Sequence, residues 1–285
     1  MSRIAYVNGR YLPHASAGVH IEDRGYQFAD GVYEVCEVRD GKLVDATRHL
    51  ARLERSLNEL RIAKPLSDAA LKVVLREVVA RNRVEHGLVY MQVTRGVAPR
   101  DHAFPAKPIR PALVVTAKSS HVQKAESNAE KGVAVVTVPE TRWARPDIKT
   151  VGLLANVLAR QAARDQGAYE AWFVDAEGYV TEGASTNAWI VTGDGHFVTR
   201  HADNAILKGI TRTTLIDLLK REGLKLIERP FTPDEAKTAR EAFITSATSI
   251  VLPVVSVDGV PIGNGHPGSL ATKLRATFHE IAEIS

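Results

Sequence analysis

The chain has 285 residues, of which 45% are apolar and 25% are charged, a balance typical of a globular protein with one large domain or two of ordinary size. The formal net charge of +4 is spread over interspersed acidic and basic residues, which argues against a nucleic-acid-binding tract. Cys36 is the only cysteine, which excludes an internal disulfide and a cysteine-based zinc site and favours a reducing compartment, the cytoplasm. Neither a signal peptide nor a membrane span is expected, because MSRIAYVNGRYLP lacks an apolar core and residues 250–257 are too short.

The first part of the chain combines predicted strands with two amphipathic helices. Two pairs typical of hairpin turns, Asn8-Gly9 and Asp40-Gly41, each follow a strand-like run. LVYMQVT and ALVVTA add two strands, so antiparallel pairing is expected. Helices are predicted from Thr47 and from Ser67, because apolar residues recur at helical spacing after each. These residues are Leu50, Leu53, Leu57 and Leu60 in the first helix, and Leu71, Val74, Leu75 and Val78 in the second.

The second part of the chain begins after a polar stretch without clear periodicity, AKSSHVQKAESNAEK, which indicates a linker. We therefore expect a small N-terminal α/β domain over residues 1–118, a linker over 119–131 and a larger C-terminal domain over 132–285. The predicted C-terminal elements are strands in GVAVVTV, AFITSA and IVLPVVSV, helices over 151–166 and 211–222, and hairpin turns at 176–178 and 193–195. The fold class is mixed, α/β or α+β.

Lys149 and Tyr33 are candidate site residues by their position. Lys149 stands in RPDIKTVGLLANVL, ahead of an apolar helix whose sequence we expect to be buried on at least one side. A desolvated amine has a lowered pKa and attacks aldehydes, as a Schiff-base lysine must, although a solvated lysine at a helix start fits the same pattern. In RGYQFADGVYEV, a loop delivers Tyr33 to the start of a strand, where it either packs on the sheet or reaches a site.

Glu182 ends a predicted strand and precedes a cluster of small residues in YVTEGASTNAWIV. A carboxylate in this setting can hydrogen-bond a heterocyclic nitrogen and keep it protonated, while small neighbours let a flat ring approach. An exposed acid in a turn is the alternative interpretation.

Two turns have the composition of a phosphate-binding site. In LKGITRTTL, Ile210 and Thr211 follow Gly209 at a helix start, where backbone N–H groups lack partners, and TSATS supplies further hydroxyls, among them Thr248. An ordinary helix cap explains the first turn equally well. Arg52 lies away from the leucine stripe of its helix, so the helical wheel predicts that it faces solvent.

TRGVAPRDHAFP places Arg95, Arg100 and His102 around a Gly/Pro loop that follows a strand. A guanidinium binds a carboxylate in a bidentate way, and a nearby imidazole adds a donor, so the loop suits carboxylate binding. Solvated loop charges are the alternative.

Five segments together resemble a known family. RGYQFADGVYEV, QVTRGVAPRDHAFP, DIKTVGLLANVLA, VTEGASTN and LKGITR follow one another as in the class IV aminotransferases, the pyridoxal-phosphate enzymes of fold type IV. The resemblance extends from Tyr6 to about Leu274 and implies two α/β domains with the cofactor at the domain interface. Within the family, the Pro-Arg-Asp-His loop and the Gly-Val-Tyr-Glu strand look most like D-amino-acid transaminases. The alternatives are branched-chain L-amino-acid aminotransferase, (R)-amine transaminase and 4-amino-4-deoxychorismate lyase.

The resemblance assigns roles toward the cofactor, pyridoxal 5'-phosphate. Lys149 forms the Schiff base with it and moves the substrate proton. Glu182 pairs with the pyridine nitrogen, and Leu207 packs against the ring. The residues that fall where the family binds the phosphate are Arg52, Ile210, Thr211 and Thr248.

The resemblance also implies the substrates and the assembly. Tyr33, Arg100 and His102 match residues that bind the substrate α-carboxylate, with the Arg100/His102 loop donated across a homodimer interface. The implied reaction is a ping-pong transfer of the amino group from a D-amino acid, such as D-alanine or D-glutamate, to a 2-oxo acid such as 2-oxoglutarate. Two other classes stay open: a lyase that releases pyruvate without an amino acceptor, and a binding module that ignores the cofactor.

Overall fold

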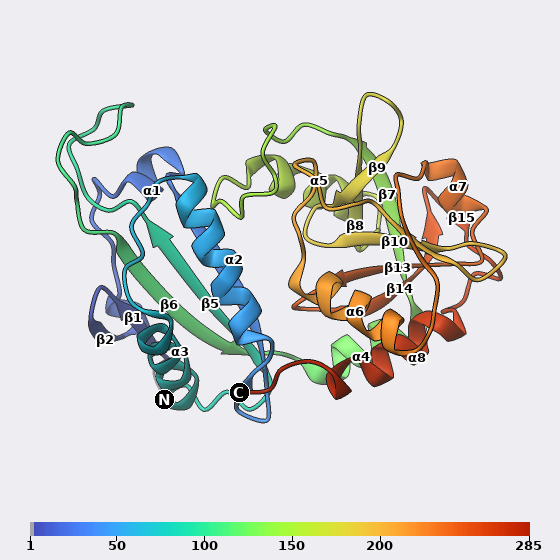
Figure 1. Cartoon of the computed structure of the whole chain (residues 1–285), viewed down its shortest axis with the longest axis horizontal. Helices are drawn as coiled ribbons and strands as arrows, with labels where there is room; N and C mark the ends of the chain where they lie inside the picture. The colour runs from blue at the N-terminus through green and yellow to red at the C-terminus, as the bar shows by residue number, and fades with distance from the viewer. Residues whose placement is uncertain (1–2) are drawn as a thin grey trace. The chain divides into compact units, whose positions relative to one another are not determined.

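The computed structural model describes residues 3–285, which fall into two units (Figure 1). The first unit contains the described residues up to His121, together with Ile148–Gly152 and Glu283–Ser285. The second unit contains Val122–Asp147 and Leu153–Ala282. The short segment that returns to the first unit carries Lys149, so the chain places this lysine on the sheet of the first unit.

The first unit is a six-stranded antiparallel sheet in the order β2-β1-β6-β5-β3-β4, with two long helices packed on it (Figure 1). Its strands are β1 Ile4–Val7, β2 Arg10–Pro13, β3 Gly31–Arg39, β4 Lys42–Leu43, β5 Gly87–Thr94 and β6 Ala112–Ser119. Its helices are η1 His14–Ser16, α1 Arg24–Phe28, α2 Ala46–Glu59 and α3 Asp68–Arg81. The predicted hairpin turns at Asn8-Gly9 and Asp40-Gly41 are confirmed, and all four residues have positive φ, as a type I′ turn requires.

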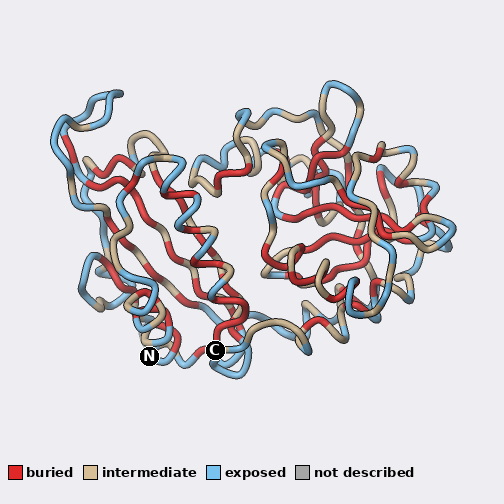
Figure 2. Tube along the Cα trace, in the orientation of Figure 1, coloured by how far each residue is buried: buried red, intermediate tan, exposed pale blue. Residues whose placement is uncertain are grey.

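The two predicted helices of this unit are confirmed, with shifted ends. The first, α2, begins at Ala46 instead of Thr47 and ends before Leu60, while Ser67 caps α3 by accepting a hydrogen bond from the Ala70 backbone N–H. The leucines of α2 and the apolar stripe of α3 pack against the strands in one buried cluster. Figure 2 draws the buried residues of these elements in red. This packing fixes which side chains of α2 and β3 face each other.

The second unit is a nine-stranded mixed sheet in the order β12-β11-β10-β13-β14-β7-β8-β9, with β15 paired to β14. The pairs β11–β12, β14–β7 and β7–β8 are parallel, and the others are antiparallel. Its strands are β7 Val133–Pro139, β8 Glu170–Val174, β9 Val180–Gly183, β10 Asn187–Val191, β11 Phe197–Thr199, β12 Leu226–Glu228, β13 Glu241–Ser246, β14 Ile250–Val257 and β15 Val260–Pro261. Its helices are α4 Val122–Lys131, α5 Leu154–Asp165, α6 Ile210–Arg221, α7 Pro233–Lys237, α8 Ser269–Thr277 and η2 Phe278–Glu280.

Two sequence expectations need correction here. Most of the segment 119–131, interpreted as a linker, is helix α4, because it contains no glycine or proline before Gly132, which ends the helix with a positive φ. The helix expected over 151–166 begins only at Leu154, because the chain before it is bound to β3, where Thr150 bridges Val32. The backbone N–H of Tyr33 donates to the Lys149 carbonyl at 3.0 Å, and that of Val151 donates to the Gly31 carbonyl at 3.1 Å.

The apolar sequence that follows Lys149 is also buried differently from our expectation. In α5 the buried residues are Ala159 and Ala163, whereas Leu154, Val157 and Leu158 have 73%, 59% and 63% of their surface exposed. Small residues face the sheet, and the large ones form an exposed apolar face.

Candidate active site

In the first unit, Lys149 and Tyr33 meet at the start of β3. The Lys149 Nζ lies 3.2 Å from the Tyr33 hydroxyl and 4.3 Å from the centre of its ring. Both side chains are half-buried, and the Tyr33 ring stacks on Tyr90 with centroids 5.6 Å apart. The Lys149 backbone is held by β3 and by the hydroxyl of Ser56 on α2, which accepts from the Lys149 N–H at 3.4 Å. The Lys149 amine is thus held beside the hydroxyl of Tyr33, which stands on β3.

Arg52 is part of a buried cluster with Glu34 and His49, which we call the first cluster. The Arg52 Nε and one terminal nitrogen each donate to the Glu34 carboxylate at 2.8 Å, and the His49 Nδ1 lies 2.7 Å from the same carboxylate. Glu34 is fully buried, and the side chain of Arg52 is only 9% exposed, so the helical-wheel prediction that Arg52 faces solvent was wrong. The wheel failed because β3 presents an acid toward α2, and this acid draws the guanidinium inward.

The charge state of Glu34 follows from competing effects. Burial raises the pKa of its carboxyl, but the charge and hydrogen bonds of Arg52, with the His49 hydrogen bond, outweigh burial and lower the pKa to about 2. The carboxylate is therefore ionised at neutral pH and paired with the guanidinium. Arg52 lies one helical turn before Ser56, on the side of α2 that reaches the Lys149 segment.

In the second unit, Glu182 is buried in β9 with 4% of its surface exposed, which excludes the interpretation as an exposed turn acid. Its carboxylate accepts from the Asn187 side-chain amide at 2.9 Å and from the Leu207 backbone N–H at 3.1 and 3.2 Å. Asn187 also donates to the Leu207 carbonyl at 3.0 Å. Two residues therefore fix the orientation of the Glu182 carboxylate.

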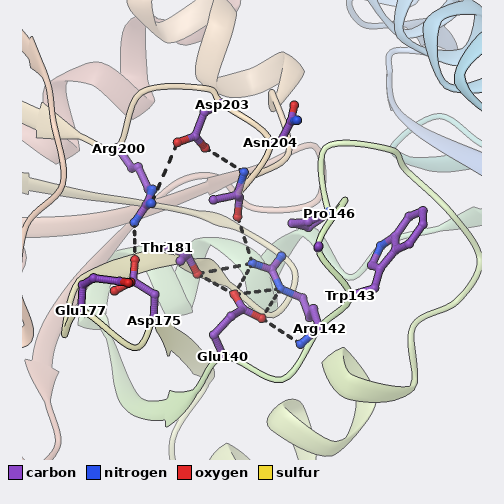
Figure 3. A pocket seen from close by; sticks show the side chains of 12 residues that line it. Glu140, Arg142, Trp143, Pro146, Asp175, Glu177, Thr181, Arg200, Asp203 and Asn204 are labelled. Carbon is purple, nitrogen blue, oxygen red and sulfur yellow. Dashed lines mark hydrogen bonds and ion pairs between the residues drawn. The ribbon is translucent and has the colours of Figure 1, made fainter.

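Arg142 joins Glu182 to a second acid, Glu140, and we call these three residues the second cluster. Arg142 donates to Glu182 and, at 2.6 to 3.2 Å, to both oxygens of Glu140, and it also contacts the Thr181 hydroxyl and the Ala205 carbonyl (Figure 3). Burial raises the pKa of Glu140, but the hydrogen bonds and charge of Arg142 outweigh burial and hold it below its ordinary value. Glu140, Arg142 and Thr181, which Figure 3 labels, line a hollow of about 690 Å³.

The turns expected to bind phosphate lie at one end of β10 and β13, two central strands of the second sheet. Ile210 and Thr211 are the first residues of α6, and no side chain caps this helix at Gly209. The backbone N–H groups of the first turn can therefore donate hydrogen bonds to an anion. Gly209 lies close to Asn187, because a Cβ added to Gly209 would be 2.0 Å from the side-chain amide oxygen of Asn187. Asn187 pairs with Thr245, the first residue of the TSATS turn, so both turns lie at the same end of β10 and β13.

The TSATS turn itself has an unusual backbone. The exposed Thr248 hydroxyl lies 2.9 Å from that of Ser246, and Ile250, which ends the turn, has a φ of +58°. A β-branched residue is strained in this left-handed region, and such strain concentrates at functional sites.

The loop between β5 and β6, residues 95–111, projects beyond the strands that it joins (Figure 1). Its Arg100 and His102 are exposed, and both pack on the ring of Phe28, at 4.9 Å for the guanidinium and 5.4 Å between ring centres. Among the described residues, no hydrogen bond or ring contact joins Tyr33 to Arg100 or His102. The three residues expected to bind the α-carboxylate are therefore not in mutual contact within the described chain.

Sequence reasoning missed several residues that these contacts bring into the site. They are Glu34, His49, Glu140, Arg142 and Asn187. The signal for Glu34 was present, because it shares with Val32, Cys36 and Val38 the period-two pattern that faces the core. Arg142 and Glu140 follow β7 in a polar stretch without a distinguishing spacing, so nothing in the sequence points to them.

These features define a class of protein. A family model described as "Amino-transferase class IV" matches residues 31–257. The chain is 42% identical to D-alanine aminotransferase of Bacillus licheniformis over 95% of its length and 94% of that protein, and 37% identical to the Staphylococcus haemolyticus enzyme over 98% and 97%. The chain belongs to the class IV aminotransferase family, as its sequence motifs predicted, and it is an aminotransferase that uses pyridoxal phosphate.

Solved structures agree on the fold. Branched-chain amino acid aminotransferase of Escherichia coli superposes with a TM-score of 0.89 at 23% identity and covers 99% of this chain and 94% of its own. The T.th. branched-chain enzyme with pyridoxamine 5'-phosphate gives a TM-score of 0.87 at 26% identity, with 98% and 94% covered. The predicted fold type IV architecture is confirmed.

The residues present fit pyridoxal phosphate by their chemistry. The half-buried lysine amine suits the aldehyde of this cofactor, and the buried carboxylate surrounded by donors suits its ring nitrogen. The arginine and the uncapped helix start suit its phosphate.

Among residues 3–285, none of the helices has both the length and the apolar composition of a membrane span.

Proposed function

We propose that this protein transfers the amino group of a D-amino acid, of the D-alanine or D-glutamate type, to a 2-oxo acid such as 2-oxoglutarate by a ping-pong mechanism. The proposal is carried by the contact between the Lys149 amine and the Tyr33 hydroxyl, because it joins the lysine to one of the residues assigned to the substrate α-carboxylate. The high identity to curated D-alanine aminotransferases over nearly the full chain supports the choice of substrate class.

In this proposal, the residues predicted from the sequence serve one pyridoxal phosphate molecule. Lys149 holds the cofactor covalently, Glu182 accepts a hydrogen bond from the protonated ring nitrogen, and Leu207 packs on the ring. The cofactor phosphate binds to Arg52, Ile210, Thr211 and Thr248. When bound, the cofactor accepts the amino group and withdraws electrons from the substrate α-carbon.

The residues of the chain then supply proton transfer and stereochemistry. The Lys149 Nζ would take the proton from the substrate α-carbon and deliver it to C4′ of the cofactor. Tyr33, Arg100 and His102 bind the α-carboxylate. With the carboxylate fixed and a single base on one face, only the D-enantiomer points its α-hydrogen at the amine. In the second cluster, Arg142 donates to Glu182 and helps to hold its orientation.

A panel of single half-reactions tests the substrate class. Holoenzyme is mixed with D-alanine, L-leucine or (R)-1-phenylethylamine, and the loss of the visible absorption of the bound cofactor is followed. We expect D-alanine to react fastest. Arg100→Ala should lower kcat/KM for D-alanine roughly 30-fold or more, because losing a guanidinium that becomes desolvated when it pairs with the substrate carboxylate costs on the order of 2–5 kcal/mol. Faster reaction with L-leucine would indicate a branched-chain enzyme, and pyruvate release without an acceptor would indicate a lyase.

We further propose a cytoplasmic homodimer in which the Arg100/His102 loop of one chain completes the active site of the other. The projecting loop with its exposed Arg100 supports this, and so does the exposed apolar face of Leu154, Val157 and Leu158 on α5, because such faces mark interaction surfaces. The buried single thiol of Cys36 agrees with a reducing compartment.

Subunit complementation tests the exchange of the loop. Lys149→Ala chains and Arg100→Ala chains are unfolded, mixed and refolded together. If the loop acts on the partner's site, a hybrid dimer contains one site with both an intact Lys149 and an intact loop, and activity returns. If the loop acts within its own chain, every site lacks one of the two groups, and the mixture stays as inactive as its components.

A further inference from the structure

The first turn of the RGYQFAD segment forms a buried support for the β5–β6 loop. The side chain of Arg24 is only 3% exposed, and its two terminal nitrogens donate to the backbone carbonyls of Asp101 at 2.6 Å and His102 at 3.4 Å. Its Nε donates to Asp30 at 2.8 Å. A single buried guanidinium thus holds the main chain of the loop tip that carries Arg100 and His102.

Phe28, at the other end of the same short helix, contacts the side chains of the loop. The guanidinium of Arg24 lies 4.8 Å from the Phe28 ring centre, that of Arg100 lies 4.9 Å from it, and the His102 ring lies 5.4 Å away. Cations and imidazole rings are attracted to the face and edge of an aromatic ring, so Phe28 restricts where Arg100 and His102 point.

Asp30 connects this support to the base of the loop. It accepts from Arg24 and also, in a bidentate pair at 2.7 and 3.0 Å, from Arg95 at the end of β5. Arg95 in turn donates to the carbonyls of Leu60 and Arg61 after α2 and lies 3.8 Å from the Phe104 ring centre. The base is narrow, because a Cβ on Gly96 would meet the Arg110 carbonyl at 2.1 Å.

We infer that Arg24 and Phe28 are positioning residues that set substrate affinity by holding Arg100 and His102 in the geometry that binds the substrate α-carboxylate. This inference rests on the proposed function of Arg100. Free loop side chains lose conformational entropy on binding, and prior restriction by Arg24 and Phe28 removes part of that cost. The support is therefore a determinant of carboxylate recognition, separate from Lys149 and from the cofactor.

The chain offers variants that separate positioning from folding. Arg24→Met leaves Asp30 paired with Arg95, so no acid is left uncompensated. Phe28→Leu removes the ring faces but keeps an apolar side chain, and Phe28→Tyr keeps the ring as a conservative control. Tyr26→Leu, on the same helix with 76% of its surface exposed, is the matched control. Should Arg24→Met fail to fold, Phe28→Leu carries the same test.

The experiment compares D-alanine with D-alaninol, which lacks the carboxylate, in single half-reactions of the holoenzyme. Arg24→Met and Phe28→Leu should raise the half-saturating D-alanine concentration about tenfold, leave the maximum rate within about twofold, and leave the D-alaninol reaction unchanged. Phe28→Tyr and Tyr26→Leu should behave as the unmodified protein. Equal losses with both compounds, or unchanged D-alanine affinity, would overturn the inference.

A double-mutant cycle separates this inference from the proposed function. If Arg24 acts through Arg100, adding Arg24→Met to Arg100→Ala should change the D-alanine reaction far less than Arg24→Met alone does. Fully additive effects would show that Arg24 acts elsewhere and contradict the inference, whereas an Arg100→Ala protein with unchanged D-alanine kinetics would contradict the proposed function itself.

Discussion

The two buried charge clusters of this protein are built from the same groups in different proportions. The first cluster holds one carboxylate, Glu34, against the guanidinium of Arg52 and the His49 imidazole. The second holds two carboxylates, Glu140 and Glu182, against the single guanidinium of Arg142. In the first cluster one carboxylate is therefore paired with one arginine, and in the second cluster two carboxylates share one arginine.

This difference matches the two ends of the proposed cofactor. A phosphate is anionic and suits an oriented guanidinium, whereas a protonated ring nitrogen is cationic and suits a carboxylate that a neighbouring arginine has not fully neutralised. In each cluster, the residue proposed to bind the cofactor is oriented by a buried residue of opposite charge. The proportion of acidic to basic groups thus distinguishes a cluster that suits an anion from one that suits a cation.

Lys149→Ala should have the largest effect, because it removes the reacting amine while both clusters remain. We expect the protein to fold and to bind cofactor non-covalently, with transamination reduced by several orders of magnitude. Borohydride should no longer attach the cofactor to the chain, as peptide mapping by mass spectrometry will show. Lys118→Ala, at an exposed position, is the control. A cofactor-labelled peptide with another lysine would refute the assignment.

Glu34→Gln tests whether the first cluster is an ion pair that supports the fold. Leaving the buried Arg52 guanidinium uncompensated should destabilise the protein by about 3 kcal/mol at pH 7, seen as a lower thermal midpoint. Glu37→Gln, on the opposite and less buried face of β3, should change the thermal midpoint little.

The pH dependence of this difference has a definite sign. The pKa of Glu34 is lowered to about 2 in the folded protein, so its stabilising contribution is complete above the unfolded value of about 4.3 and is lost as the pH falls toward 2. The midpoint difference between Glu34→Gln and the unmodified protein should therefore be constant above about pH 5 and shrink below about pH 4. A difference that does not change with pH would contradict the ion pair.

Glu182→Gln should lower kcat roughly 100-fold in protein that still binds cofactor and keeps its melting temperature, because one preorganised charge at the reacting system is lost while the shape is kept. Steady-state kinetics with saturating cofactor measure this. Turnover close to that of the unmodified protein would mean that the buried carboxylate is structural.

Glu140→Gln should have the smallest effect, a loss in kcat of less than about tenfold, because Glu140 does not contact the cofactor site itself and acts on Glu182 through its neighbours Arg142 and Thr181. The two substitutions should be non-additive, and Glu140→Gln should change nothing in the Glu182→Gln protein. Additive losses would show that Glu140 acts independently.

How much of the fold could be predicted from the sequence depends on how far apart in the chain the interacting residues are. Local patterns predicted the hairpin turns and the stripes of α2 and α3, because turn chemistry and helical period depend on neighbouring residues. The same local reasoning failed for Arg52, since the acid that draws it inward belongs to β3, 18 residues earlier in the chain.

The candidate site shows the same limit. Lys149 and Glu182 were found through ordered motifs, but Arg142 contacts Glu182 across 40 residues of chain, and no local spacing encodes that contact. Arg24 holds a loop 77 residues away. Residues proposed to bind the cofactor stand in recognisable segments, whereas those that orient them are chosen by tertiary packing.

Equilibrium binding of cofactor analogues tests the division between the clusters most directly. The unmodified protein, Arg52→Met and Glu182→Gln are titrated with pyridoxal phosphate, with pyridoxal, which lacks the phosphate, and with 1-deazapyridoxal phosphate, which lacks the ring nitrogen. We predict that Arg52→Met weakens binding of the two phosphorylated compounds roughly tenfold or more and leaves pyridoxal unaffected. Glu182→Gln should abolish the preference of the unmodified protein for pyridoxal phosphate over its deaza analogue. Equal losses for pyridoxal and pyridoxal phosphate in Arg52→Met, or a preserved preference in Glu182→Gln, would contradict the assignment of the first cluster to the phosphate and of the second to the ring nitrogen.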